Sequence, residues 1–334
     1  MRLSFQLFDV MKRVEVRLFK KHTTSFCYNQ PRIIQIETTN RCNLSCEWCF
    51  RYFRKPHKDM NISEFKTIVE DIAYAKEIYP FGGGEPLLHP QFDKFISLAS
   101  NHADYVGINS NGVSLDRKAT EKLDVSGITE LTISIDSPDV KIFNYIRKGA
   151  DLKKVKKNVE YFSSHSKVPL RIHAVLSTLT LASSLDLPKM AKELGAQKLT
   201  FNLLHPTPRS LDLMPEAQKL ISTCEKLRML CAEFRLETNV DDILKKQPTN
   251  MCRAPLLTCF IDSEGYMTPC CNYPMLRLGN VLKEGFRSCW NSRKMRTFRK
   301  TVLVGNFPIW CQTFCMMPRN LLAGPYEVDR THKF

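Results

Sequence analysis

Residues 37–50 read ETTNRCNLSCEWCF and place Cys42, Cys46 and Cys49 in a Cys-x3-Cys-x2-Cys pattern. Three thiolates this close together bind a soft metal centre, but a four-iron cluster needs a ligand on its fourth iron as well. Zinc is the alternative, and it requires a further Cys or His. His57 lies eight residues beyond Cys49 and keeps that alternative open on spacing alone.

The pattern resembles the signature of the radical S-adenosylmethionine (SAM) enzymes, in which SAM supplies the missing ligand through its amino and carboxylate groups. Trp48 occupies the aromatic position that this family has before its third cysteine. The resemblance implies that Cys42, Cys46 and Cys49 hold a [4Fe-4S] cluster. It also implies that Trp48 lies near the nucleoside of SAM.

Composition narrows the class of protein. The chain has 334 residues, 13 cysteines and a net charge of +15, without an apolar run long enough to span a membrane or a secretory signal pattern. Many cysteines without such a signal indicate a reducing, cytoplasmic compartment and metal binding rather than disulfides. The positive charge favours an anionic substrate or partner, with an ordinary solvated surface as the alternative.

Residues 1–28 are expected to form a basic amphipathic N-terminal helix. Leu3, Leu7, Val10, Val14 and Leu18 recur at steps of three and four residues, which is one face of a helix. We favour a role in covering one end of the domain. The alternative is a peripheral membrane contact through residues 1–22, which would make the protein membrane-associated.

Residues 29–240 alternate between strand-like and helix-like segments. The expected strands are 33–37, 78–81, 105–109, 130–136, 170–177 and 198–204; the expected helices are 63–76, 90–102, 116–124, 140–162, 184–194 and 214–235. Asn61, Asp116 and Ser183 are the expected N-caps. Six βα units predict an α/β fold with a parallel sheet. The resemblance implies a partial (β/α)6 TIM-like barrel, followed over residues 241–334 by a small Cys-rich α+β domain of the SPASM or twitch type.

In such a barrel the site lies at the C-terminal ends of the strands. The second strand ends in Gly82-Gly83-Gly84-Glu85, which resembles the GGE motif of the family. The resemblance implies that Gly83, Gly84 and Glu85 bind the amino end of SAM. Asn109 and Asn111, at the end of the third strand, either contact SAM or substrate or cap the turn.

The fourth strand ends in Ser134-Ile135-Asp136. The resemblance implies that Ser134 and Asp136 lie beside the ribose and methionine parts of SAM; substrate binding and helix capping are alternatives for Asp136. Arg147 matches an Arg-x-Gly position of the family. His173 and His205, on the last two strands, are more often hydrogen-bonded structural residues than catalysts, and no catalytic residue is assigned.

The C-terminal cysteines form a second group. Asp262-Ser263-Glu264-Gly265 between apolar runs predicts a hairpin, which places Cys252 and Cys270 at the same end of two strands. The segment resembles the SPASM or twitch extension and implies one auxiliary [4Fe-4S] cluster on Cys252, Cys270, Cys311 and Cys315. Cys259 in place of Cys311, and a structural zinc ion, are alternatives. The remaining buried candidates are Cys27, Cys224, Cys231 and Cys289.

The resemblance implies an enzyme that cleaves SAM reductively to a 5′-deoxyadenosyl radical and takes a hydrogen atom from its substrate. The substrate, a peptide, a small molecule or a lipid head group, is then oxidised or rearranged with help from the auxiliary cluster. A reducing partner such as ferredoxin or flavodoxin is implied. One alternative is a non-enzymatic iron–sulfur electron-transfer or interaction protein. Another is a nucleotide- or RNA-modifying radical SAM enzyme, although the chain shows no RNA-binding motif and we do not expect nucleic acid as a partner.

Overall fold

The computed structural model describes residues 25–49, 57–72, 74–204, 215–245, 252–273 and 275–315. Residues 1–24 of the helix predicted over 1–28 and the candidate His205 lie outside these ranges, and residues 25–28 are not helical. No helix within them is long and apolar enough to cross a membrane.

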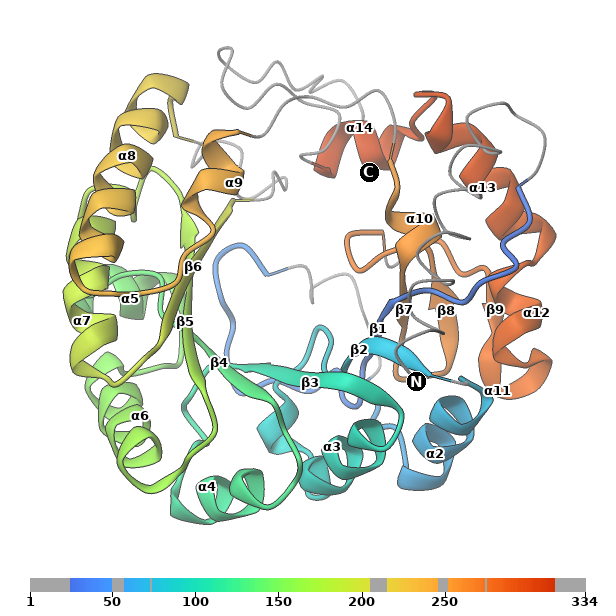
Figure 1. The fold of residues 1–334 in the computed structure, drawn as a ribbon, viewed down its shortest axis with the longest axis horizontal. Coiled ribbons are helices and arrows are strands. Elements are labelled where there is room, and N and C mark those ends of the chain that lie inside the picture. The colour runs from blue at the N-terminus through green and yellow to red at the C-terminus, as the bar shows by residue number, and fades with distance from the viewer. Residues whose placement is uncertain are drawn as a thin grey trace.

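A nine-stranded sheet in the order β6-β5-β4-β3-β2-β1-β7-β8-β9 organises the molecule (Figure 1). Its first six strands are β1 (Ile33–Ile36), β2 (Ala75–Tyr79), β3 (Ala103–Ser110), β4 (Glu130–Ser134), β5 (Leu170–Leu176) and β6 (Lys198–Leu203). These strands pair in parallel in chain order. The predicted partial (β/α)6 barrel is therefore confirmed.

Helices cover the outer face of this curved sheet (Figure 1). They are α2 (Ile62–Asp71), α3 (Phe92–Ser100), α4 (Arg117–Asp124), α5 (Val140–Ile146), α6 (Leu152–His165), α7 (Leu187–Glu193), α8 (Ala217–Glu233) and α9 (Val240–Leu244), with 3-10 turns η2 (Pro86–Leu88) and η3 (Ser183–Asp186). The alternation along β5 shows why. Ile172 and Ala174 are fully buried in the core, whereas Arg171 and His173, which alternate with them, are half-buried and line a cleft on the inner face.

Local signals explain where helices begin. Asn61 caps α2 through a capping box with Glu64, and Asp116 caps α4 by accepting the N–H of Ala119, as predicted. The predicted cap at Ser183 is wrong. Ser183 is instead the first residue of η3, whose N-cap is Ala182, and its hydroxyl donates to the carbonyl of Thr180 at 3.2 Å.

Two predicted helices differ from the observed helices in where they begin or end. The helix predicted over 140–162 is two helices, α5 and α6, separated by a turn in which Gly149 has φ +98°. Only glycine adopts that backbone conformation without strain, so the chain changes direction there. The helix predicted over 63–76 ends at Asp71, because β2 begins at Ala75, earlier than the predicted start at Ile78.

The C-terminal part continues the same sheet. Strand β7 (Thr258–Ile261) pairs in parallel with β1, and β8 (Tyr266–Thr268) and β9 (Gly279–Asn280) follow in antiparallel order. The predicted hairpin is therefore confirmed. The helices of this part are α10 (Ala254–Leu257), α11 (Val281–Glu284), α12 (Phe286–Trp290), α13 (Arg293–Leu303) and α14 (Ile309–Phe314).

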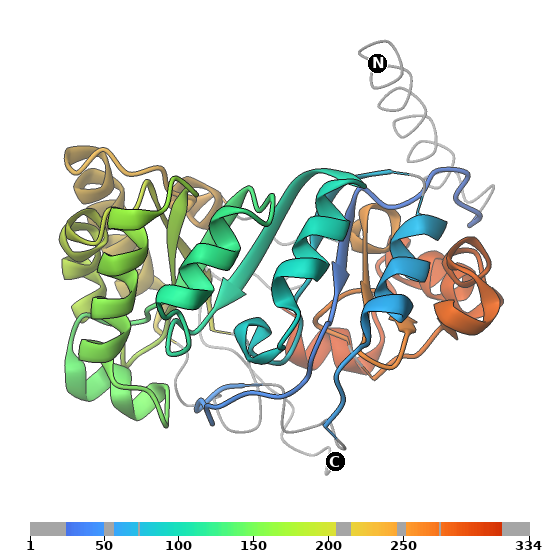
Figure 2. The same cartoon turned by 90° about the horizontal axis from the view of Figure 1, so that it is seen from below.

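Residues 25–29 are attached to this C-terminal part, and Figure 2 shows the start of the described chain beside it. The amide of Asn291 exchanges two hydrogen bonds with the backbone of Cys27, at 2.8 and 2.9 Å. The indole N–H of Trp290 donates to the carbonyl of Asn29 at 3.0 Å. The first and last described segments therefore stabilise each other across the sheet.

Candidate cluster and SAM site

The loop that carries Cys42, Cys46 and Cys49 follows β1 and is held against the end of α5. The N–H of Ser45 donates to the carbonyl of Lys148, and the N–H of Glu47 donates to the carbonyl of Ile146, both at 2.9 Å. A Cβ on Gly149 would lie 3.3 Å from the carbonyl oxygen of Asn43. The turn between α5 and α6 thus supports the backbone of the cysteine loop directly.

The base of the loop is anchored on its other side. The guanidinium of Arg41 donates two hydrogen bonds to the carboxylate of Asp59, at 2.9 and 2.5 Å, and the hydroxyl of Thr39 donates to the same carboxylate at 2.6 Å. Charge-assisted forked pairs of this kind fix orientation as well as distance. The three thiols are half-buried. Their loop is therefore supported from two directions, as a cluster site requires.

A buried cation lies beside these thiols. Burial raises the pKa of Cys46 to about 11, and the charge of Arg147 acts against that rise. Arg147 is held by two hydrogen bonds to Asp136, at 2.7 and 3.1 Å. Thiols that bind a metal are deprotonated and carry negative charge. The positive charge of Arg147 beside the cysteines therefore suits a metal site.

Asp136 has bonds of its own in this arrangement. Besides Arg147, its carboxylate accepts the N–H of Val175 at 2.9 Å, and the residue has no exposed surface. The alternative that it caps the next helix is wrong, because Asp139 caps α5. The predicted contact of Asp136 with SAM stays a prediction.

Glycines bring the end of β2 against the cysteine loop. A Cβ on Gly84 would lie 2.3 Å from the carbonyl oxygen of Thr39 and 2.5 Å from that of Arg41, which no side chain tolerates. The N–H of Glu85 donates to the carbonyl of Arg41 at 2.7 Å. The need for glycine at position 84 thus follows from packing within the chain. The predicted contacts of Gly83 and Gly84 with SAM stay a prediction.

The carboxylate of Glu85 joins the ends of β2 and β3. It is buried and accepts the hydroxyl of Ser110 at 2.8 Å and the N–H groups of Asn111 and Leu87 at 2.7 and 3.1 Å. Burial raises its pKa. A SAM amino group at Glu85 would therefore share a carboxylate that already accepts three bonds.

Other predicted residues gather at the same end of the sheet. The side-chain amide of Asn111 donates to Asn43 at 2.8 Å and lies 3.9 Å from the sulfur of Cys42. The hydroxyl of Ser134 donates to Asn109 at 2.9 Å across β3 and β4. Trp48 is half-buried on the cysteine loop. The structure thus brings the ends of β1 to β4 together, as the motifs predicted.

Glu37 is a site residue that the sequence reasoning missed. Its carboxylate has no exposed surface and accepts the N–H of Gly83 at 2.7 Å and the N–H of Ser263 at 3.1 Å. A Cβ on Gly82 would lie 2.4 Å from the Cβ of Glu37. One carboxylate therefore ties the glycine loop to the β7–β8 hairpin. The available signal was an acidic residue at the end of an apolar strand.

We expect Glu37→Gln to destabilise the protein. Glutamine keeps the shape but presents an NH2 group to one of the two N–H donors, and an unsatisfied buried donor costs about 1–3 kcal/mol. Urea unfolding of the reconstituted protein measures the change. Glu70→Gln is the matched control, because Glu70 pairs with Lys66 on the exposed face of α2. Equal unfolding free energies for both variants would contradict a role for Glu37 in joining the two loops.

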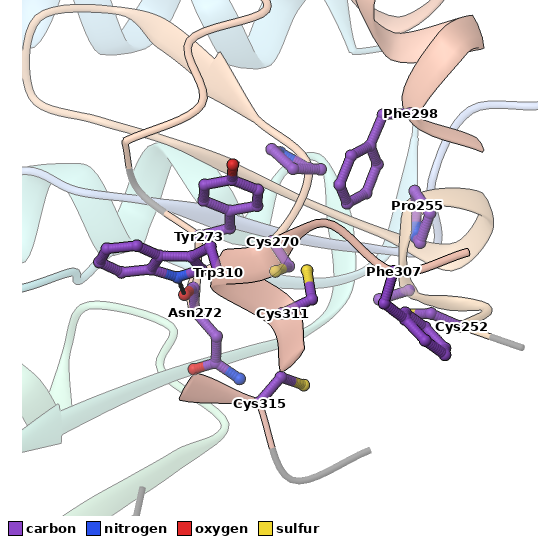
Figure 3. Close-up of a pocket in the computed structure, with 12 residues that line it drawn as sticks. Cys252, Pro255, Cys270, Asn272, Tyr273, Phe298, Phe307, Trp310, Cys311 and Cys315 are labelled. Carbon is purple, nitrogen blue, oxygen red and sulfur yellow. Dashed lines mark hydrogen bonds between the residues drawn. The ribbon is translucent and has the colours of Figure 1, made fainter. Parts of the chain in front are cut away.

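The second cysteine group lines one pocket (Figure 3). Cys252 precedes α10, Cys270 follows β8, Cys311 lies in α14 and Cys315 follows it. The walls are mainly proline and aromatic side chains: Pro255, Pro269, Tyr273, Phe298, Phe307 and Trp310. Burial, and then the neighbouring thiols of Cys315 and Cys252, raise the pKa of Cys311 to about 12. Four thiols around an apolar pocket are a donor set that fits an iron–sulfur cluster.

Cys259 lies elsewhere. It is on β7, opposite Ile34 of β1, with 2% of its surface exposed, and it does not line the pocket. The geometry favours Cys311 over Cys259 as the fourth thiol. Cys27, Cys224, Cys231 and Cys289 are buried as predicted. Within the described ranges, no three His, Cys, Asp or Glu side chains converge closely enough to hold a single metal ion.

A polar cleft of about 460 Å³ opens on the inner face of β5 and β6. It is lined by Arg171, His173, Lys198, Thr200, Asn202, Glu237, Thr238 and Asn239. His173 bonds Thr200 at 3.0 Å, and burial lowers the pKa of His173 to about 4, which leaves the ring neutral at pH 7. His173 is therefore hydrogen-bonded, as predicted, and whether it also acts on a substrate stays a prediction. His173 also lies opposite Ser134 in the sheet, so the cleft begins one strand from the predicted SAM site.

Comparisons with known proteins agree with this geometry. The model of the radical SAM superfamily matches residues 36–182, and the SPASM model, an iron–sulfur cluster-binding domain, matches residues 252–315. The chain belongs to the radical SAM superfamily. As a radical SAM enzyme with a SPASM domain it uses [4Fe-4S] clusters and SAM, which confirms the predicted cofactors and the enzyme class.

Similar proteins align with most of this chain. The chain is 27% identical to the AdoMet-dependent heme synthase of Methanosarcina barkeri, over 81% of this chain and 85% of that protein. It is 25% identical to the mycofactocin maturase MftC of Mycobacterium tuberculosis, over 82% and 74%. The fold is similar to that of Streptococcus suis SuiB bound to S-adenosylmethionine, with a TM-score of 0.70 and 18% identity over 86% and 72% of the two chains.

Proposed function

We propose that this enzyme takes a hydrogen atom from a peptide substrate and oxidises that substrate with help from one auxiliary cluster. The observation that carries the proposal is that four cysteines from separate segments, Cys252, Cys270, Cys311 and Cys315, line one apolar pocket. A second thiol set that fits an iron–sulfur cluster supports auxiliary redox chemistry. The electron-carrier alternative leaves the SAM-side motifs without a purpose.

Each cysteine group has its own part. Cys42, Cys46 and Cys49 hold the first cluster, and Cys252, Cys270, Cys311 and Cys315 hold the second. When bound, the first cluster and SAM supply a 5′-deoxyadenosyl radical. Gly83, Gly84 and Glu85 receive the amino end of SAM, and Trp48, Asn109, Ser134 and Asp136 lie along the rest of it.

The surrounding residues orient these groups. Arg147, held by Asp136, places positive charge beside Cys46 and Cys49 and offsets the charge of the thiolates. Glu85 and Asn111 fix the end of β3 against the cysteine loop. Because these groups are buried and already bonded to each other, they do not reorganise during the reaction.

The polar cleft supports a peptide substrate. Its hydroxyl, amide and ionic groups offer hydrogen-bond partners to a peptide backbone and its side chains, whereas a flat apolar molecule would leave them unpaired. The structure of SuiB bound to precursor peptide SuiA, which shares this fold, supports the same class. A reducing partner such as ferredoxin or flavodoxin is part of the proposal. A membrane contact through residues 1–22 stays a prediction.

Cys270→Ala tests the proposal. We expect the variant to lose about four of about eight irons per chain, to keep SAM cleavage in the absence of substrate, and to form no oxidised product. Cys271→Ala is the matched control, because Cys271 is the next residue, is exposed and does not line the pocket. Iron analysis and detection of 5′-deoxyadenosine are the measurements. Full iron content in Cys270→Ala would refute the second site, and wild-type protein that cleaves no SAM would return it to the electron carriers.

A further inference from the structure

The C-terminal part has a basic surface directly outside the auxiliary cysteine pocket. Residues 285–315 contain the cations Arg287, Arg293, Lys294, Arg296, Arg299 and Lys300 and no Asp or Glu. Four of the six lie on α13, are exposed and take no part in the ion pairs among the described residues: Arg293, Lys294, Arg296 and Lys300. A block of one sign of charge creates a field that attracts an oppositely charged partner.

Helical periodicity sorts α13 into two faces. Arg293, Arg296 and Lys300 are spaced by three and four residues, so they form one exposed stripe. The buried residues Phe298 and Val302 lie on the opposite side. Phe298 lines the auxiliary pocket, and the carbonyl of Val302 accepts the N–H of Cys252 at 3.1 Å. The charged stripe and the auxiliary pocket therefore lie on opposite sides of one helix, which is about 10 Å in diameter.

Apolar side chains continue this surface. Val304, directly after α13, is 50% exposed, and Ile309, at the start of α14, is 57% exposed. Phe307 lies between these two residues in the chain, and Trp310 follows Ile309. Both Phe307 and Trp310 line the pocket. A few exposed apolar residues beside a charged rim are typical of small, transient protein interfaces.

We propose that the α13 face, defined as Arg293, Arg296, Lys300, Val304 and Ile309, docks a small acidic electron-transfer protein. The inference rests on the proposed function, because it assumes that the four thiols hold a redox cluster. In each encounter the oxidised partner takes up the one electron that the auxiliary cluster received from the substrate, so the partner is reduced and the cluster is reoxidised. Charge complementarity selects the partner, and α13 carries both the charged stripe and Phe298 of the pocket wall.

The test compares two variants with the same loss of charge. The first replaces Arg293, Arg296 and Lys300 by Gln. The second replaces Lys153, Lys154 and Lys157 by Gln on α6, whose exposed lysines lie on the opposite side of the molecule from α13 (Figure 1). The probe is an acidic flavodoxin, and its association with the reconstituted enzyme is measured by titration and stopped flow at several salt concentrations.

We expect the α13 variant to bind flavodoxin about tenfold more weakly at low salt and with a shallower salt dependence, since rim charges act mainly on association. The α6 variant should bind like the wild type. Equal weakening in both variants would mean that only net charge matters and would overturn the proposal, as would no weakening in either.

A membrane is the other anionic surface that α13 could meet. Vesicles of equal parts phosphatidylcholine and phosphatidylserine form the second arm. Loss of vesicle binding by the α13 variant, with flavodoxin binding intact, would also overturn the proposal. Iron content and SAM cleavage without substrate, measured on the wild type, report separately on the proposed function. These two measurements therefore distinguish failure of the proposed function from failure of the proposal that the α13 face docks a partner.

Discussion

Cys46→Ala is expected to abolish SAM cleavage and to remove about four irons per chain, since a [4Fe-4S] cluster that keeps only two protein thiols is not retained. Cys46 is the central thiol of the loop and lies beside the buried Arg147. Iron and sulfide analysis and an electron-resonance spectrum with and without SAM measure the loss. The remaining signal should come from the second site and should not shift on addition of SAM.

Cys231→Ala provides the control. Cys231 is a fully buried residue of α8 and lines neither cysteine site. Its loss removes a small apolar group and should leave iron content and SAM cleavage at the wild-type level. Retention of a SAM-dependent spectral shift in Cys46→Ala would show that the three-cysteine loop does not hold the SAM-binding cluster.

Asp136→Ala is expected to lower the free energy of unfolding by about 3–5 kcal/mol, because it leaves Arg147 as an uncompensated buried charge. Asp136 has no exposed surface and the Arg147 side chain is 12% exposed. The N–H of Val175 loses its acceptor as well. Denaturant unfolding of the reconstituted protein measures the change.

Two further variants separate the causes. Glu121→Ala breaks an exposed pair with Arg117 on α4 and should cost less than about 1 kcal/mol. The double variant Asp136→Leu with Arg147→Met removes both charges and should be more stable than Asp136→Ala, since no buried charge is left unpaired. If the double variant is the less stable of the two, burial of an unpaired charge is not the cause.

Motifs with strict spacing allowed several features of this protein to be predicted from its sequence. The three-cysteine loop, the glycines after β2 and the Asp262–Gly265 turn each have a local pattern, and the structure places them where that pattern predicted. The alternation of strands and helices was readable for the same reason, because burial on one face imposes a period along the chain. Helix ends were less readable. Ser183 is the first residue of η3 rather than the cap before it, and helix ends are uncertain by one or two residues.

The sequence by itself determined the fold class, the family and the two groups of cysteines, because those depend on residues close together in the chain. The tertiary structure alone decided which distant groups meet. It paired Asp136 with Arg147, placed Glu37 between Gly83 and Ser263, and directed Cys311 rather than Cys259 to the second pocket. The pairing of β7 with β1 produces the contact of Glu37 with Ser263, and pairing between segments more than 200 residues apart has no local signal.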